Sequence, residues 1–135
     1  TNGYANNIQD AFNDIINHYY DKKVDFMTVK DAIEIIHKSN GKAIWAHPYD
    51  IMDFVSKKRI NRTEIELLCA ELSKINLDGI ETYYEPYNNT QINYLKKLQE
   101  KYELISSVGT DFHGKDDKKI TYLDIDENIL IGVFK

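Results

Sequence analysis

Three short apolar segments, separated by stretches with helical periodicity, restrict the fold of this sequence more than any other feature. They cover residues 42–46, 78–84 and 104–108, and each has the length of a buried strand. Strands that alternate with helices of about 10–15 residues are typical of βαβ units, in which neighbouring strands run parallel. The sequence therefore predicts the α/β fold class, with a parallel sheet or barrel.

Apolar residues recur at helical intervals in the segments between and before the strands. This spacing predicts helices over residues 6–20, 28–39, 50–58, 63–75 and 90–102. Thr28 is the expected N-cap of the second helix, and Gly41 is its expected stop. Thr63 and Glu66 have the spacing of a capping box at the start of the fourth helix. Residues 120–135 contain β-prone pieces without a clear period.

The length of 135 residues suits one domain, so residues 1–135 are predicted to form a single unit. A closed eight-fold barrel needs about 250 residues. We count three to four βα units, which predicts a half-barrel, a fragment or a small open sheet. The carboxyl ends of parallel strands are where such folds place their chemistry, so those ends are the first places to search.

Composition narrows the function classes. The net charge of −5 argues against a groove for duplex nucleic acid, which needs a basic face. A small phosphorylated ligand stays compatible, because bound metal ions supply positive charge locally. No apolar run approaches the ~18–20 residues of a membrane helix, and the polar start does not resemble a signal peptide. We therefore expect a soluble, cytoplasmic protein without a membrane partner.

Cys69 is the single cysteine, so no intramolecular disulfide can form, which fits a reducing compartment. It lies in the apolar run of a predicted helix. Cysteine is among the most often buried residue types, so we interpret Cys69 as a small buried apolar residue and not as a nucleophile.

Metal-competent side chains follow two of the predicted strands. His47 comes directly after the first strand, and Asp111 and His113 follow the third. In an extended Asp-x-His segment the first and third side chains point to the same side, so one short loop can present an oxygen and a nitrogen ligand. Imidazole and carboxylate together suit Mn, Zn or Fe. The pattern predicts a divalent metal site at the strand ends.

Each of these motifs also has a plainer interpretation. A His-Pro pair such as His47-Pro48 is most often a turn, and Asp-x-His is common in proteins. Glu81, inside the second predicted strand, is interpreted as a structural carboxylate that is either hydrogen-bonded or solvent-facing. Lys115 lies in a loop of mixed charge and is either solvated or close to a substrate phosphate. Two motifs at two strand ends of one sheet favour the metal site.

Three stretches carry a family resemblance: GKAIWAHP, then LDGIETYY, then LISSVGTDFHG. In order and spacing they resemble the later motifs of the PHP phosphoesterases, and most closely the branch related to nucleoside 3′,5′-bisphosphate phosphatases. The resemblance implies a distorted (βα)7 barrel whose cleft holds two or three divalent metals that activate water. It implies that His47, Asp111 and His113 are metal ligands. Residues 1–40 then resemble the end of a helical insertion with the first barrel helix, and residues 41–135 resemble the C-terminal βα units.

Several parts of the family pattern are missing from this chain. The opening His-x-His motif, an early Asp, a second-strand His and a bridging Glu all precede the matched region in the family. The resemblance therefore implies the C-terminal half of a metal-dependent phosphoesterase that is inactive alone and acts on a small phosphorylated substrate with the missing N-terminal half. One alternative is a non-catalytic docking or structural module. Another is self-association of two copies, because a half-barrel leaves sheet edges uncovered.

Overall fold

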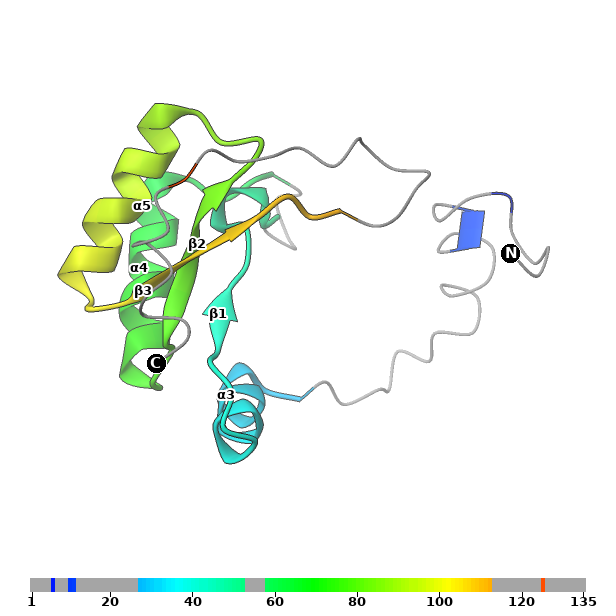
Figure 1. Cartoon of the computed structure of the whole chain (residues 1–135), viewed down its shortest axis with the longest axis vertical. Helices are drawn as coiled ribbons and strands as arrows, with labels where there is room; N and C mark the ends of the chain where they lie inside the picture. Colours follow the sequence, from blue (N-terminus) through cyan, green and yellow to red (C-terminus); the bar gives the residue numbers. More distant parts are fainter. Residues whose placement is uncertain (1–5, 7–9, 12–26, 53–57, 113–124, 126–135) are drawn as a thin grey trace.

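The computed structural model describes residues 6, 10–11, 27–52, 58–112 and 125, and all structural statements below concern these residues (Figure 1). Their elements, in chain order, are α3 (Val29–Lys38), β1 (Ile44–Trp45), the 3-10 helix η2 (Pro48–Asp50), α4 (Arg62–Lys74), β2 (Gly79–Tyr84), α5 (Asn89–Lys101) and β3 (Ile105–Gly109). The helix expected over residues 6–20 and the β-prone tail at 120–135 lie almost wholly outside the described residues. Among the described helices, none combines the length and the apolarity that crossing a membrane requires.

The three strands form one parallel sheet in the order β1-β2-β3. In the register, Ile44 pairs with Gly79, and Gly79 pairs in turn with Ile105. α4 connects β1 to β2 and α5 connects β2 to β3, so both connections are βαβ crossovers. The predicted α/β class and the parallel sheet are therefore confirmed. Closure of the sheet into a barrel, and any further βα unit, stay predictions.

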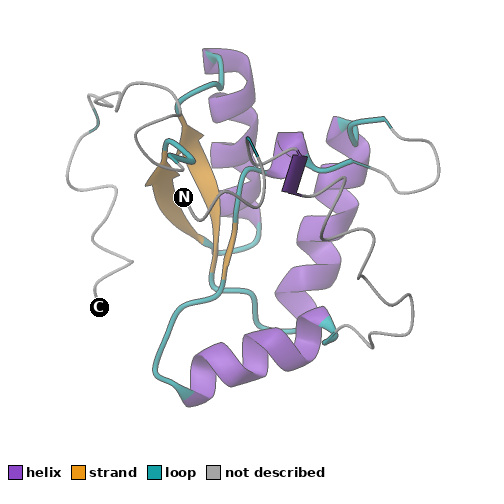
Figure 2. Ribbon diagram, turned by 90° about the vertical axis from the view of Figure 1, so that its right-hand side faces the viewer, coloured by secondary structure: helices purple, strands orange, loops and turns teal. Residues whose placement is uncertain are grey.

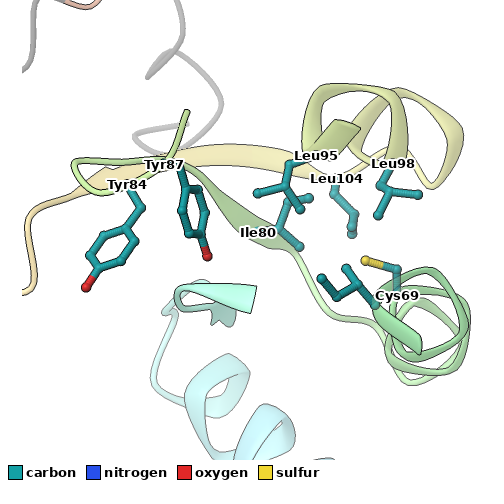
Figure 3. Close-up of a cluster of buried hydrophobic side chains, with 8 residues drawn as sticks. Cys69, Ile80, Tyr84, Tyr87, Leu95, Leu98 and Leu104 are labelled. Carbon is teal, nitrogen blue, oxygen red and sulfur yellow. The ribbon is translucent and has the colours of Figure 1, made fainter. Parts of the chain in front are cut away.

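Both crossover helices cover the same face of the sheet. Figures 1 and 2 show α4 and α5 together beside the strands, while α3 lies at the end where the strands begin. The buried apolar cluster draws on both helices and on β2, as Figure 3 shows; it contains Ile65, Cys69, Ile80, Tyr84, Tyr87, Leu95, Leu98 and Leu104. Ile80 is fully buried at its centre. The aliphatic residues and Cys69 thus form the hydrophobic core on this face of the sheet, and Tyr84 and Tyr87 extend the cluster at the carboxyl end of β2 (Figure 3).

A register shift between Glu81 and Tyr83 interrupts the alternation of side chains along β2. The extra residue is Thr82, which is fully buried and accepts a hydrogen bond from the Ser106 hydroxyl of β3. After the shift, Tyr83 lies on the α5 side, where the Lys96 ammonium is 5.6 Å from its ring centroid. Tyr84 is consequently turned to the same face as Glu81. Bulges re-aim side chains in this way and are common near functional sites.

The helix termini confirm one predicted cap and correct two details. The Thr28 side chain caps α3, accepting a hydrogen bond from the Asp31 N–H. The stop of α3 is different from the prediction: Asn40, with φ 58°, takes the left-handed position, and the Gly41 N–H bonds back to the Ile36 carbonyl. This is a Schellman arrangement, and asparagine tolerates left-handed backbone better than most residues.

The capping box predicted at Thr63 and Glu66 is wrong. α4 begins earlier, with Asn61 as N-cap and Glu64 as the reciprocal partner. The Asn61 side chain accepts from the N–H groups of Thr63 and Glu64, and the Glu64 carboxylate accepts from the Asn61 N–H. Asparagine is a stronger N-cap residue than threonine, so the local sequence favours the capping box that begins at Asn61 over the one that begins at Thr63.

The helix predicted over residues 50–58 is also wrong in its described part. After η2, Ile51 is extended, and Met52 forms an antiparallel bridge with Arg59. The Ile60 N–H donates to the Ile51 carbonyl across the same pair of segments. These backbone groups therefore bond across a loop and not along a helix. Pro48 opens η2, and this 3-10 helix ends at Asp50.

Asp78 fastens α3 and the start of β1 to the start of β2. Its Oδ2 lies 2.6 Å from the His37 Nε2 and accepts from the Ala43 N–H at 2.7 Å, while Oδ1 accepts from the Lys42 ammonium at 3.1 Å. Burial by itself raises the pKa of Asp78, but the hydrogen bonds from His37, Ala43 and Lys42 outweigh it and bring the pKa below its ordinary value.

We expect Asp78→Asn to lower the free energy of unfolding at pH 7 by about 1–2 kcal/mol, because hydrogen bonds to a charged acceptor are lost. A carboxylate with a depressed folded pKa stabilises above its unfolded pKa of about 3.9, and this contribution disappears as pH falls through the folded value. The gap between wild type and variant should therefore close below about pH 4. Urea unfolding from pH 3 to 7 measures it, and a gap independent of pH would contradict the explanation. Glu34→Gln removes an exposed carboxylate 3.9 Å from Lys38 and should change stability by under about 0.5 kcal/mol.

Candidate functional site

His47 stands just past the carboxyl end of β1 in an unusual backbone conformation. Its φ of 29° and ψ of 64° lie in the left-handed region, which costs a non-glycine residue about 1–3 kcal/mol unless the surroundings impose it. Both of its backbone groups are held: the N–H donates to the Glu81 Oε2 at 2.7 Å, and the carbonyl accepts from the Asp50 N–H at 2.9 Å. Pro48 follows and opens η2. The turn that presents the imidazole is therefore fixed from both sides.

Glu81 lies in β2 on the face opposite α4 and α5, between the ends of its two neighbouring strands. Its carboxylate reaches the His47 N–H of the β1 end, as described above, and it also abuts Gly109 at the end of β3. A Cβ atom at Gly109 would overlap the Glu81 Oε1. Of the two structural readings of Glu81, the hydrogen-bonded one is confirmed.

Asp111 stands two residues past the end of β3 and also has left-handed backbone, with φ 52°. Aspartate adopts this region more readily than most residues, because its short polar side chain bonds locally. Asp111 is exposed. The candidate ligands at the ends of the two strands that flank β2 thus both have left-handed backbone, and strain of this kind clusters at functional sites.

Tyr84 borders the His47 ring, and Tyr87 and Tyr49 pack in series behind Tyr84. The Tyr84 ring centroid lies 5.7 Å from that of His47, and Tyr87 packs edge-on against Tyr84 at 5.0 Å (Figure 3). Tyr49 packs edge-on against Tyr87 at 5.3 Å, and its N–H donates to the Tyr87 hydroxyl at 2.9 Å. This wall was not foreseen from the sequence. The only sequence signal for this aromatic cluster was the close succession of Tyr83, Tyr84 and Tyr87. The β2 bulge decides that Tyr84, and not Tyr83, faces His47.

Besides burial, four carboxylates raise the pKa of the Tyr84 hydroxyl through their negative charge. Burial raises its pKa, and the negative charges of Asp111, Asp50, Glu81 and Glu85 raise it further, in that order. Burial also raises the pKa of Tyr87, with Asp50 and Glu81 contributing in the same direction. The His47 ring thus lies next to Tyr84, and the Asp111 charge acts on the same Tyr84, although the two residues follow different strands. The local field is negative, which favours a bound cation.

The donor atoms fit a divalent metal ion in part. The Nδ1 of His47 is buried and has no hydrogen-bond partner within the described portion of the chain. An unpaired buried polar atom costs about 1–3 kcal/mol, and a metal ion would satisfy it. Imidazole nitrogen with a carboxylate suits Mn, Zn or Fe. No cluster of three or more His, Cys, Asp or Glu ligands occurs within residues 27–52 and 58–112. His113 and Lys115, the other predicted site residues, lie outside the described residues.

Cys69 takes no part in this chemistry. It is fully buried in α4, and burial, followed by the nearby Glu66 carboxylate, raises the pKa of its thiol to about 11. The thiol is therefore protonated at neutral pH, and the prediction of a buried apolar cysteine is confirmed.

Comparison with known proteins supports the resemblance at superfamily level. No family model matches the chain. A phosphoribosyl 1,2-cyclic phosphate 1,2-diphosphodiesterase of Eggerthella lenta is 24% identical over 95 residues, covering 70% of this chain and 32% of the relative. The 5′-3′ exoribonuclease Rnm of Salmonella typhimurium is 33% identical over 88 residues, covering 64% and 27%, and that of Escherichia coli is 28% identical over 86 residues with the same coverage.

The chain spans about a third or less of the length of these relatives. By their names, a diphosphodiesterase and an exoribonuclease, both kinds of relative cleave phosphate esters, which supports a phosphoesterase-type function. The likeness does not distinguish the bisphosphate phosphatase branch from the others.

Proposed function

We propose that this chain carries the C-terminal part of a divalent-metal-dependent phosphoesterase, with His47, Asp111 and His113 as metal ligands. The observation that carries the proposal is the buried Nδ1 of His47, which has no hydrogen-bond partner among the described residues and lies at the carboxyl edge of a parallel sheet. The His47 ring lies next to Tyr84, on which the Asp111 charge also acts. The names of the relatives add the reaction class. Mn, Zn and Fe all suit the donor atoms.

A bound divalent ion supplies a Lewis acid for a phosphate ester and the means of ionising water near neutral pH. The residues of this chain hold and orient that ion. His47 contributes a nitrogen whose direction the fixed turn sets, and Asp111 contributes a negative oxygen from the end of β3, on the other side of β2. Neither acts as a general base. The buried rings of Tyr84 and Tyr87 exclude water from one side of His47 and so strengthen its interaction with a cation.

The substrate we propose is a small phosphate ester, in particular a nucleotide or short oligonucleotide. Lys115, four residues after Asp111, is proposed to approach its phosphate. The described ligands are too few for a closed metal site, so we propose that an N-terminal half of the barrel, or a second copy of the chain, completes it. A cytoplasmic location fits this role.

Metal titration of the full 135-residue chain, followed by hydrolysis assays on the complete protein, tests the proposal. We expect the chain to bind Mn²⁺ or Zn²⁺ weakly, and His113→Ala to remove this binding. The complete protein should release phosphate from nucleotides, stop when a chelator is added, and recover with Mn²⁺. Hydrolysis that persists in excess chelator would overturn the metal-dependent mechanism. Absence of hydrolysis from any phosphate ester would favour the docking-module alternative.

A further inference from the structure

We infer that Glu81 is a positioning residue, which sets the direction of the His47 imidazole by holding the His47 backbone in its left-handed turn. The inference rests on the proposed function, since it takes His47 as a metal ligand. Glu81 itself is assigned no contact with the metal or with substrate.

The contact that carries the inference joins the middle of one strand to the end of the next. The Glu81 Oε2 accepts from the His47 N–H at 2.7 Å. Hydrogen bonds to an ionised acceptor are roughly twice as strong as neutral ones. A residue in the left-handed region stays there only when its surroundings over-determine it. Here this bond and the closure of the turn by the Asp50 N–H provide that constraint.

A carboxylate in the middle of a parallel strand needs an explanation of its own. Such strands are normally rich in apolar residues, and burying a carboxylate is costly unless it is paired. Glu81 is half-buried in β2, and a candidate metal ligand's backbone N–H is a partner of this carboxylate. The position of Glu81 therefore fits a residue that stabilises the turn after β1 and not the sheet itself.

Gly109 of β3 leaves room for the Glu81 carboxylate, because glycine has no Cβ atom. A Cβ there would overlap the Glu81 Oε1, so a larger residue would push the side chain off its place. One oxygen of Glu81 therefore faces His47 while the other abuts Gly109, two residues before Asp111.

Losing this bond frees the His47 backbone to return to ordinary negative φ, which redirects the imidazole. Outer groups that orient metal ligands typically contribute roughly 10- to 100-fold to metal affinity. We expect Glu81→Ala to weaken Zn²⁺ binding by that factor. Glu81→Gln keeps an oxygen acceptor of the same length, so it should retain affinity within about fivefold of wild type.

The test uses the full chain, ¹⁵N-labelled, with Zn²⁺ alone as the probe. The amide proton of His47 should resonate well downfield in wild type because it bonds to a carboxylate. It should stay partly downfield in Glu81→Gln and lose the shift in Glu81→Ala. The amide signals of Leu95 and Leu98, buried on α5, report in each variant that the core is folded.

Gly109→Ala should remove the hydrogen bond between Glu81 and the His47 N–H by a second, independent change. It should displace the carboxylate and reproduce both the amide shift and the weaker binding of Glu81→Ala. In the double variant Glu81→Ala/Gly109→Ala the overlap no longer exists, so the effects should not add. Full additivity would overturn the inference.

Two further outcomes would overturn it. In the first, Glu81→Ala leaves the His47 amide shift and the Zn²⁺ affinity unchanged. In the second, Glu81→Gln loses Zn²⁺ as completely as Glu81→Ala, which would make Glu81 a direct ligand. Failure of the proposed function looks different: His47 signals in wild type would then not respond to Zn²⁺ at all, whatever stands at position 81.

Discussion

Asp111→Ala is expected to reduce metal-dependent hydrolysis by the complete protein roughly 100- to 1,000-fold. Metal ions contribute several kcal/mol of charge stabilisation to phosphate-ester cleavage, and each 1.4 kcal/mol corresponds to about a factor of ten in rate. Asp111 is the described carboxylate at the end of β3, and among the charges on Tyr84 it makes the largest contribution. Its removal takes away both the oxygen of a proposed ligand and much of the local negative field.

Because the Asp111 backbone is left-handed, a second variant that tolerates this conformation is needed as a control. With φ 52°, alanine would be strained there, whereas asparagine tolerates this conformation nearly as well as aspartate. Asp111→Asn should therefore keep the fold and still lose most of the activity, because the charge is gone. Glu100→Ala, an equal loss of charge on the exposed side of α5, should leave the rate unchanged. Near-normal turnover in Asp111→Asn would remove Asp111 from the proposed ligands.

Ile80→Ala is expected to lower the free energy of unfolding by about 2–5 kcal/mol. Truncating a fully buried aliphatic side chain loses its transfer free energy and leaves a cavity. Ile80 lies in the central strand, opposite Trp45 of β1 and Ser106 of β3, with residues of α4 and α5 packed against it. Because both helices rest on this residue, neither can easily collapse into the space. Urea unfolding of the full chain measures the loss.

Two companion variants calibrate this experiment. Ile80→Val should cost about 0.5–1.5 kcal/mol, which keeps the protein folded if alanine does not. Leu67→Ala, on α4 and 62% exposed, should change stability by under about 0.5 kcal/mol. A cost for Ile80→Ala equal to that of Leu67→Ala would mean that the two helices do not share a core over β2.

The strands and their chemistry were largely predictable from the sequence. All three apolar segments became strands, because a parallel sheet buried by helices requires continuous apolar runs. The alternation with helices implied parallel pairing, and parallel pairing brings the carboxyl ends together, which predicted His47 and Asp111 at one edge. The burial of Cys69 followed from its place in an apolar helical run.

The ends of the helices were harder to predict, because neighbouring residues compete for the same capping positions. Two capping frames overlap at the start of α4, and the stronger cap, Asn61, displaced Thr63. At the stop of α3 the left-handed residue was Asn40, one position before the expected glycine. At Ile51 and Met52 the weak helical periodicity is not followed, because Met52 pairs with Arg59, and no local signal encodes this pairing.

By itself, the sequence determined the α/β class, the strand order along the chain and the residue types at the strand ends, since these depend on local propensity and periodicity. Only the tertiary structure decided how those ends are arranged. The bond from the His47 N–H to Glu81 spans 34 residues, and the bulge that turns Tyr84 toward His47 arises from pairing β2 with β3. Both depend on the register between distant strands, which is set when the sheet assembles and not by any single segment.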